Sequence, residues 1–410
     1  MDENKSEGKK RYLANILSGS RPIIAVAICV AVVQAMVAGK AALPIWVLVA
    51  WGVLALTDWL DGVVARSNCG KTTNGATIDE MCDKIAINLT ILALCIFGRI
   101  DWYFFAIMLG RDIFVTIVRM RSREAGIDVV TNARFPGKAK TCLQFFLVLV
   151  ALMPAAWLGA LDALVIFVLS ASAMGMSLVS GMQILLLAMN AKDSTWLEGA
   201  HGEIGAPNWW SLSRIAASAA IPYMIGVQPF GYASNIITIF MLIYAISTDK
   251  IDGYLAVKLN QFTKAGKALD PLSDKVLFYP VAIAMLVATK GTLLIPGIEE
   301  PAVVLVMCLS LFLMTFRDLA FIVWYAFGYR DLPEGISSSG WDKARMVAMC
   351  VWLGAMALAM CTQEVPVGTV FAWVAYICLI ITGLTLSIAS GAVAIYRLQD
   401  LKAKIKADSE

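Results

Sequence analysis

The chain has 410 residues, of which 60% are hydrophobic and only 15% are charged. Soluble domains carry about 25% charged residues, so this composition excludes an ordinary soluble protein and places the chain in the membrane class. The net charge of +3 is too small and too dispersed to indicate nucleic-acid binding, and a single histidine, His201, all but excludes metal sites or acid–base catalysis built on histidine.

Apolar stretches that can become membrane helices recur along the chain, and a spanning helix needs about 20 mainly apolar residues. The first half has such stretches at 22–39, 41–57, 85–98, 102–118, 141–160 and 163–191. The second half has them at 215–248, 276–289, 302–316, 346–363 and 367–396. The run 215–248 is too long for one span, and its Gln228-Pro229-Phe230-Gly231 turn divides it in two. We therefore predict an all-α integral membrane protein with about twelve transmembrane helices.

Polar motifs of the first half recur in the second half. Such a repeat indicates a duplicated structural unit. We predict a first six-helix unit over 1–192, a linker over 193–206 and a second six-helix unit over 207–410, both in the same orientation. The recurring residues are Asn15, Ser18 and Arg21 with Asn208, Ser211 and Arg214; Asp58, Asp61, Asp79 and Asp83 with Asp249, Asp252, Asp270 and Asp274; and Arg111-Asp112 with Arg317-Asp318.

Basic residues of the short loops gather on one predicted side of the membrane. The positive-inside rule assigns that side to the cytoplasm, so we expect both termini and the polar motifs there, in a bacterial-type cytoplasmic membrane. The basic N-terminal stretch leads into membrane segments without a small-residue cleavage pattern, so we expect no removable signal peptide. The basic residues of this side include Lys9, Lys10, Arg11, Arg66, Lys71, Arg119, Arg121, Arg134, Lys138, Lys140, Lys402 and Lys404.

The four aspartates of each unit lie at the ends of two consecutive predicted helices. Asp58 and Asp61 are three residues apart and Asp79 and Asp83 are four apart, so each pair shares one helix face. Two like charges about 4 Å apart repel by about 4 kcal/mol at an effective dielectric of about 20, so a cation is needed. Oxygen ligands favour Mg²⁺, Mn²⁺ or Ca²⁺ over zinc. Solvated loop charges would explain one such pair, but not its recurrence.

The spacing Asp-x2-Asp-Gly-x2-Ala-Arg-x8-Gly-x3-Asp-x3-Asp over 58–83 resembles the signature of the CDP-alcohol phosphatidyltransferases. The second copy, 249–274, matches except that Val257 replaces the arginine. Segments 15–21, 207–214 and 137–141, with Arg111 and Arg119, resemble motifs of the phosphatidylglycerophosphate synthase branch, although Tyr325 stands where Arg119 would recur.

The resemblance implies a pseudo-dimer of the two halves. It also implies two Mg²⁺ or Mn²⁺ ions per active unit, held by the four aspartates of that unit. It implies that an alcohol attacks CDP-diacylglycerol and releases CMP, with Asp83 and Asp274 as general bases. By the same resemblance, the nucleotide would be bound by Asn15, Gly62, Ala65, Arg66, Gly75, Asn208, Gly253, Ala256 and Gly266. An anionic acceptor would be bound by Arg111, Arg119, Lys138, Lys140, Arg317, Lys343 and Arg345.

The basic residues favour a phosphorylated alcohol as the acceptor but do not name it. The resemblance to the phosphatidylglycerophosphate synthase branch implies glycerol 3-phosphate, which would give phosphatidylglycerol phosphate. Three alternatives stay open. Another acceptor of the same family, namely phosphatidylglycerol, an inositol phosphate or serine, could take its place. The second half could be a non-catalytic partner. A transporter of six plus six helices shares the layout, but its polar residues would lie near the bilayer midplane.

Overall fold

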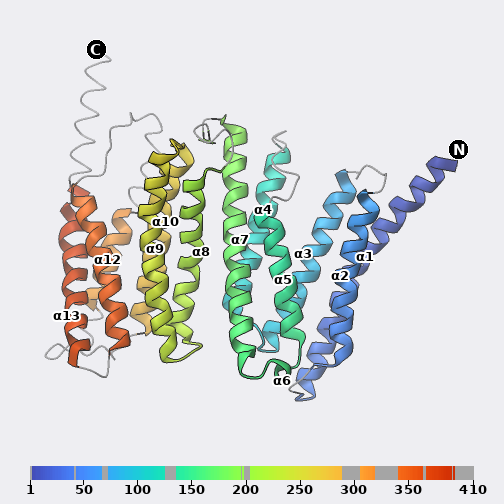
Figure 1. Cartoon of the computed structure of the whole chain (residues 1–410), viewed down its shortest axis with the longest axis horizontal. Helices are drawn as coiled ribbons and strands as arrows, with labels where there is room; N and C mark the ends of the chain where they lie inside the picture. The colour runs from blue at the N-terminus through green and yellow to red at the C-terminus, as the bar shows by residue number, and fades with distance from the viewer. Residues whose placement is uncertain are drawn as a thin grey trace, which may run out of the picture. The chain divides into compact units, whose positions relative to one another are not determined.

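The computed structural model describes residues 2–40, 43–66, 73–124, 135–194, 196–197, 204–288, 305–318, 340–362, 366–389 and 391–392. Over these ranges the chain is helical and contains no strand. It divides into two compact units, Met1–Ile204 and Gly205–Glu410 (Figure 1). The finer limits of the predicted linker stay a prediction.

The described part of the first unit consists of long helices, with short helical turns at 155–161 between α5 and α7. Its buried core includes Trp51, whose indole nitrogen donates to the carbonyl oxygen of Phe145 at 3.2 Å. The long helices are α1 (Asp2–Val37), α2 (Ile45–Arg66), α3 (Thr73–Ile96), α4 (Trp102–Glu124), α5 (Phe135–Leu152) and α7 (Asp162–Lys192).

The second unit repeats this plan. Its core lies around Trp352 and Phe278, whose ring centroids are 5.5 Å apart. A further helix covers 305–318. The other elements are α8 (Ala206–Val227), α9 (Tyr232–Lys258), α10 (Lys264–Ala288), α12 (Gly340–Cys361), α13 (Pro366–Ile380) and the π-helical turn η3 (Ile381–Leu386).

The same helix pairs pack in both units. Helix α1 packs on α2 and α3, and α8 packs on α9 and α10. Helix α5 packs on α2, α3 and α7, and α12 packs on α9, α10 and α13. The predicted duplication therefore appears in the packing within each unit, and the first helix of each unit lies against the two helices that carry the aspartates.

The predicted break in the long apolar run 215–248 is confirmed. Helix α8 ends at Val227, Gln228 adopts the left-handed backbone conformation with a φ of 47°, and Gly231 also has a positive φ, of 55°. Pro229 lacks the N–H that a continuing helix would need. The Phe230 N–H instead donates to the Ser234 hydroxyl at 3.0 Å, at the start of α9.

Six helical segments of the described chain are long enough and apolar enough to cross a membrane. The chain is therefore an integral membrane protein. A helix satisfies all its backbone hydrogen bonds internally, as the bilayer requires. Helices α2, α3, α4 and α9 are not among the six, and they carry charged residues of the recurring motifs. The count of twelve spans stays a prediction. The six segments are Ser20–Val37, Phe135–Leu152, Ala155–Lys192, Lys264–Ala288, Lys343–Cys361 and Gly368–Ala389.

Candidate active site

A buried arginine stands among the aspartates of the second unit. Arg214, on α8, is 0% exposed. Its guanidinium donates to Asp252 at 2.8 Å and to Asp274 at 2.7 Å, and it lies 3.4 Å from Asp249. Its other donors reach the hydroxyls of Thr248 at 3.1 Å and Ser273 at 2.9 Å. One guanidinium therefore joins carboxylates of two helices, α9 and α10.

Ser211 brings the fourth carboxylate into the same cluster. It precedes Arg214 by about one turn of α8, and its hydroxyl oxygen lies 2.9 Å from Asp252 Oδ2 and 3.1 Å from Asp270 Oδ1. The four aspartates predicted to converge in this unit are thus brought together. The sequence did not predict that the polar face of α8 lies against these aspartates.

Asn208, one further turn toward the start of α8, holds the loop between α9 and α10. Its Nδ2 donates to Thr263 Oγ1 at 3.2 Å, and the same oxygen accepts the Gly266 N–H at 3.0 Å. A Cβ added to Gly266 would lie 2.9 Å from Asn208 Oδ1, which is closer than real contacts allow. Gly266 is therefore required by a close approach to Asn208. A Cβ at Gly253 would meet open space, and Ala256 is half-buried.

The first unit repeats the central contact. Arg21, on α1, is 0% exposed and forms an ion pair with Asp83 of α3. The backbone places Asp58, Asp61, Gly62, Ala65 and Arg66 on α2, and Gly75 and Asp79 on α3. Their side chains, and that of Asn15 on α1, lie outside the described residues, so the full cluster of this unit stays a prediction.

The donor atoms of the second-unit cluster fit a hard divalent cation. All four aspartates offer oxygen, which Mg²⁺ and Mn²⁺ prefer, and one guanidinium cannot neutralise four carboxylates. Across the ranges that the structure describes, however, no group of three or more His, Cys, Asp or Glu side chains is arranged to hold a metal ion. Arg214 and Ser211 stand among the carboxylates instead. Metal binding there requires some carboxylate oxygens to turn toward the ion.

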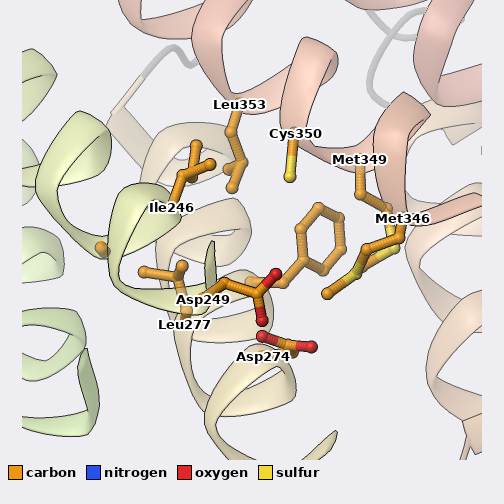
Figure 2. A pocket seen from close by; sticks show the side chains of 10 residues that line it. Ile246, Asp249, Asp274, Leu277, Met346, Met349, Cys350 and Leu353 are labelled. Atoms are coloured by element: carbon orange, nitrogen blue, oxygen red, sulfur yellow. The ribbon is translucent and has the colours of Figure 1, made fainter. Parts of the chain in front are cut away.

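A cavity of about 60 Å³ adjoins the cluster. Figure 2 shows Asp249 and Asp274 side by side at its edge, with Met346, Met349 and Cys350 of α12 facing them. The rest of its lining is apolar. The cavity therefore joins two carboxylates to an apolar space between α9, α10 and α12. The remaining lining residues are Ala245, Ile246, Leu277, Phe278 and Leu353.

The basic residues predicted to bind an acceptor surround a buried aspartate in the first unit. Asp112 of α4 accepts from Arg111 at 2.8 Å, from Asn88 at 3.1 Å and from Lys140. Arg111 also donates from Nε to the Ser177 carbonyl oxygen at 3.1 Å. These cations are therefore partly neutralised within the protein.

The second unit has the same arrangement. Asp318 accepts from Arg317 at 2.8 Å and from Arg345 at 3.2 Å. Tyr279 takes the place of Asn88, and its hydroxyl donates to Asp318 at 2.6 Å. Both aspartates belong to the sequence repeat, which by itself does not indicate that they pair with these cations.

The other predicted acceptor residues lie close to the beginning or the end of a helix. Lys138 and Lys343 are exposed, near the starts of α5 and α12. Arg119 is half-buried, about two turns beyond Arg111 on α4. The structure thus gathers Arg111 and Lys140 around Asp112, and Arg317 and Arg345 around Asp318.

Comparison with known proteins gives a match to the family model described as CDP-alcohol phosphatidyltransferase, over residues 11–181 and again over 205–382. A probable phosphatidylglycerophosphate synthase of Mycobacterium tuberculosis is 33% identical over 100 residues, covering 24% of this chain and 46% of that protein. The CDP-diacylglycerol–glycerol-3-phosphate 3-phosphatidyltransferase of Aquifex aeolicus is 38% identical over 76 residues, covering 18% and 40%.

The protein of that same name from Salmonella choleraesuis is 44% identical over 90 residues, covering 22% of this chain and 46% of that protein. The chain therefore spans less than half the length of each of these curated relatives. No solved structure matches the chain.

Proposed function

Because the chain belongs to the CDP-alcohol phosphatidyltransferase family, we propose that it transfers a phosphatidyl group from CDP-diacylglycerol to an alcohol and releases CMP. The observation that carries the proposal is the aspartate cluster around Arg214, in a chain that matches the family model twice. Glycerol 3-phosphate is the acceptor that we favour. It is the acceptor printed in the names of two relatives, and basic residues gather in both units.

In the proposed reaction the acceptor hydroxyl oxygen attacks the phosphorus that carries the diacylglycerol. A new P–O bond forms, the P–O bond to CMP breaks, and CMP leaves with that electron pair. The proton of the hydroxyl passes to a carboxylate, Asp83 in the first unit and Asp274 in the second. Two Mg²⁺ or Mn²⁺ ions, held by the four aspartates of a unit, would neutralise charge on the attacking and leaving oxygens.

The chain's own residues bind and orient the two substrates in this proposal. Gly253 leaves open space beside the cluster, where a nucleotide can approach the backbone of α9. The basic groups around Asp112 and Asp318 face the acceptor phosphate, and their carboxylate keeps them in place. Phosphoryl-type transfer depends mostly on such positioning and charge neutralisation.

We place both termini and both sites on the cytoplasmic side, as the basic loops indicate. We also propose that the two units, 1–192 and 207–410 with a linker over 193–206, form an internal pseudo-dimer. The direct test is to mix the purified chain, in vesicles, with CDP-diacylglycerol, Mg²⁺ and labelled candidate alcohols. CMP release with formation of a labelled lipid supports the proposal. Uptake of the label without CMP release would instead support a transporter.

The first prediction concerns the nucleotide side of the site. Gly266→Ala should push Asn208 away from Thr263, because the new Cβ would stand 2.9 Å from its Oδ1. Gly253→Ala should leave the fold intact, since its Cβ meets open space, yet raise the KM for CDP-diacylglycerol. Thermal unfolding and initial rates of CMP release measure both effects. A Gly253→Ala chain with unchanged KM would argue against nucleotide approach there.

The second prediction concerns the acceptor. Arg119→Ala should raise the KM for glycerol 3-phosphate about tenfold or more, since a hydrogen bond to a charged group is worth about 1.5–3 kcal/mol. The KM for CDP-diacylglycerol should change little. Arg121→Ala, which removes an exposed arginine of the same helix, is the matched control. Equal rises in the two KM values would contradict an acceptor role for Arg119.

A further inference from the structure

We propose that the buried arginine on the first helix of each unit, Arg21 and Arg214, is a positioning residue that holds the aspartates together when no metal is bound. The inference rests on the proposed function only in taking these aspartates as cation ligands. It gives a role to the serine and the arginine of the recurring Asn-x2-Ser-x2-Arg motif, to which the proposed reaction assigns none.

The contacts of Arg214 carry the first step. Its guanidinium donates to Asp252 on α9 and to Asp274 on α10, at 2.8 and 2.7 Å, although the side chain is 0% exposed. Thr248 and Ser273 accept from the same group, so its orientation is fixed from both helices. Because an arginine stays protonated in proteins and its donors form a rigid fork, it can hold two carboxylates in one geometry.

The rest of the motif extends this contact along α8. Ser211 lies against Asp252 and Asp270, and Asn208 holds Thr263 in the loop between α9 and α10. The three residues are spaced by three, so they lie on one side of the helix. The side of α8 that faces the site therefore contacts the loop and all four aspartates through hydrogen bonds or ion pairs.

The first unit shows that the arrangement is not confined to one half. Arg21 is equally buried and pairs with Asp83, the counterpart of Asp274. A duplicated ion pair at matching positions indicates a role in the site that both units share. Helix α1 packs on α2 and α3 as α8 packs on α9 and α10, so each arginine lies on a helix that contacts both aspartate-bearing helices of its unit.

Charge explains why an arginine is suited to this position. Four carboxylates repel one another, and a single permanent positive charge lowers that repulsion without removing it. The cluster can then stay assembled while it still attracts divalent cations. Removing the arginine would leave the buried Asp252 and the partly buried Asp274 without their cationic partner, which is destabilising unless a cation replaces it.

The test is the thermal unfolding of the full-length Arg214→Gln chain in lipid nanodiscs, with chelator and with Mn²⁺. In chelator we expect its unfolding midpoint to lie about 10 °C below that of the wild type. With saturating Mn²⁺ the difference should fall to less than half, because a bound cation replaces the missing positive charge and so stabilises the folded variant more than the folded wild type. Arg214→Lys keeps the charge but not the fork, and should give an intermediate shift in chelator.

Arg99→Gln is the matched control. Arg99 is also paired with a carboxylate, Asp162, at 2.7 Å, but it lies beyond the opposite end of α3 from Asp83. Its loss should lower the midpoint equally with and without Mn²⁺. The inference is overturned if Arg214→Gln behaves like Arg99→Gln, or if it unfolds at the wild-type temperature in chelator. If Arg214→Gln yields no folded chain, Arg214→Lys decides by the same comparison.

The two proposals fail in different ways. A wild-type chain that never releases CMP would overturn the proposed function, while the unfolding comparison would still give its own answer. A metal-insensitive Arg214→Gln defect in a chain that does release CMP would overturn the positioning role alone.

Discussion

Removal of divalent cations should abolish transfer to glycerol 3-phosphate, and Mg²⁺ or Mn²⁺ should restore it. One arginine pairs with three of the four aspartates of the second unit, so most of the cluster's charge is left for cations to neutralise. Two ions that stabilise the attacking and leaving oxygens contribute several kcal/mol, and about 4 kcal/mol corresponds to a factor of about 10³ in rate. The measurement is CMP release in chelator, followed by titration with each cation.

Substitution of the first-unit aspartates should have the same effect. Asp58→Ala, Asp61→Ala and Asp79→Ala should each abolish glycerol 3-phosphate transfer while the chain still inserts into membranes. Asp101→Ala, which removes an exposed carboxylate from the connection between α3 and α4, is the control and should retain activity. Full activity in excess chelator would contradict the two-metal site.

Much of the architecture could be predicted from the sequence because apolar runs and short motifs are local signals. The turn at Gln228–Gly231 and the duplication can both be recognised in the sequence. The helix boundaries and the helix pairs that pack together agree with them. The aspartates were found because their spacing places them on shared helix faces. The meeting of α9 and α10 at one point also followed from a short loop.

What the sequence did not reveal depends on contacts between distant helices. The aspartate spacing predicts that positive charge must lie among the carboxylates, but from the sequence we attribute that charge to metal ions alone. Arg214 supplies part of this positive charge. It lies on α8, which is brought against the aspartates by folding. Likewise, the sequence predicts that Arg111 and Lys140 bind an acceptor, but it does not reveal that Asp112 pairs with both. The recurrence of Arg21 as Arg214, and of Asp112 as Asp318, was the available signal.

The two units differ at residues predicted to bind the nucleotide and the acceptor. Val257, in the place of Arg66, is 70% exposed and offers no charge, and Tyr325, in the place of Arg119, lies outside the described residues. Lys140 and Arg345 pair with corresponding aspartates, which aligns α5 with α12. In that alignment Met346 and Met349 of the apolar cavity stand where the first unit has Thr141 and Gln144.

The second unit should therefore transfer poorly to glycerol 3-phosphate, although its four carboxylates remain. Asp83→Asn removes the proposed base of the first unit and should lower glycerol 3-phosphate transfer by about 10²–10⁴-fold. Asp274→Asn should leave that rate largely unchanged, because each lost positive charge weakens anion binding in the second unit by about 1.5–3 kcal/mol. Labelled product lipid, formed by each variant under identical conditions, measures both rates. In the Asp83→Asn chain, a labelled alcohol of lower negative charge should be the better acceptor. If Asp274→Asn eliminates glycerol 3-phosphate transfer while Asp83→Asn leaves it intact, the roles assigned to the two units are reversed and the prediction is wrong.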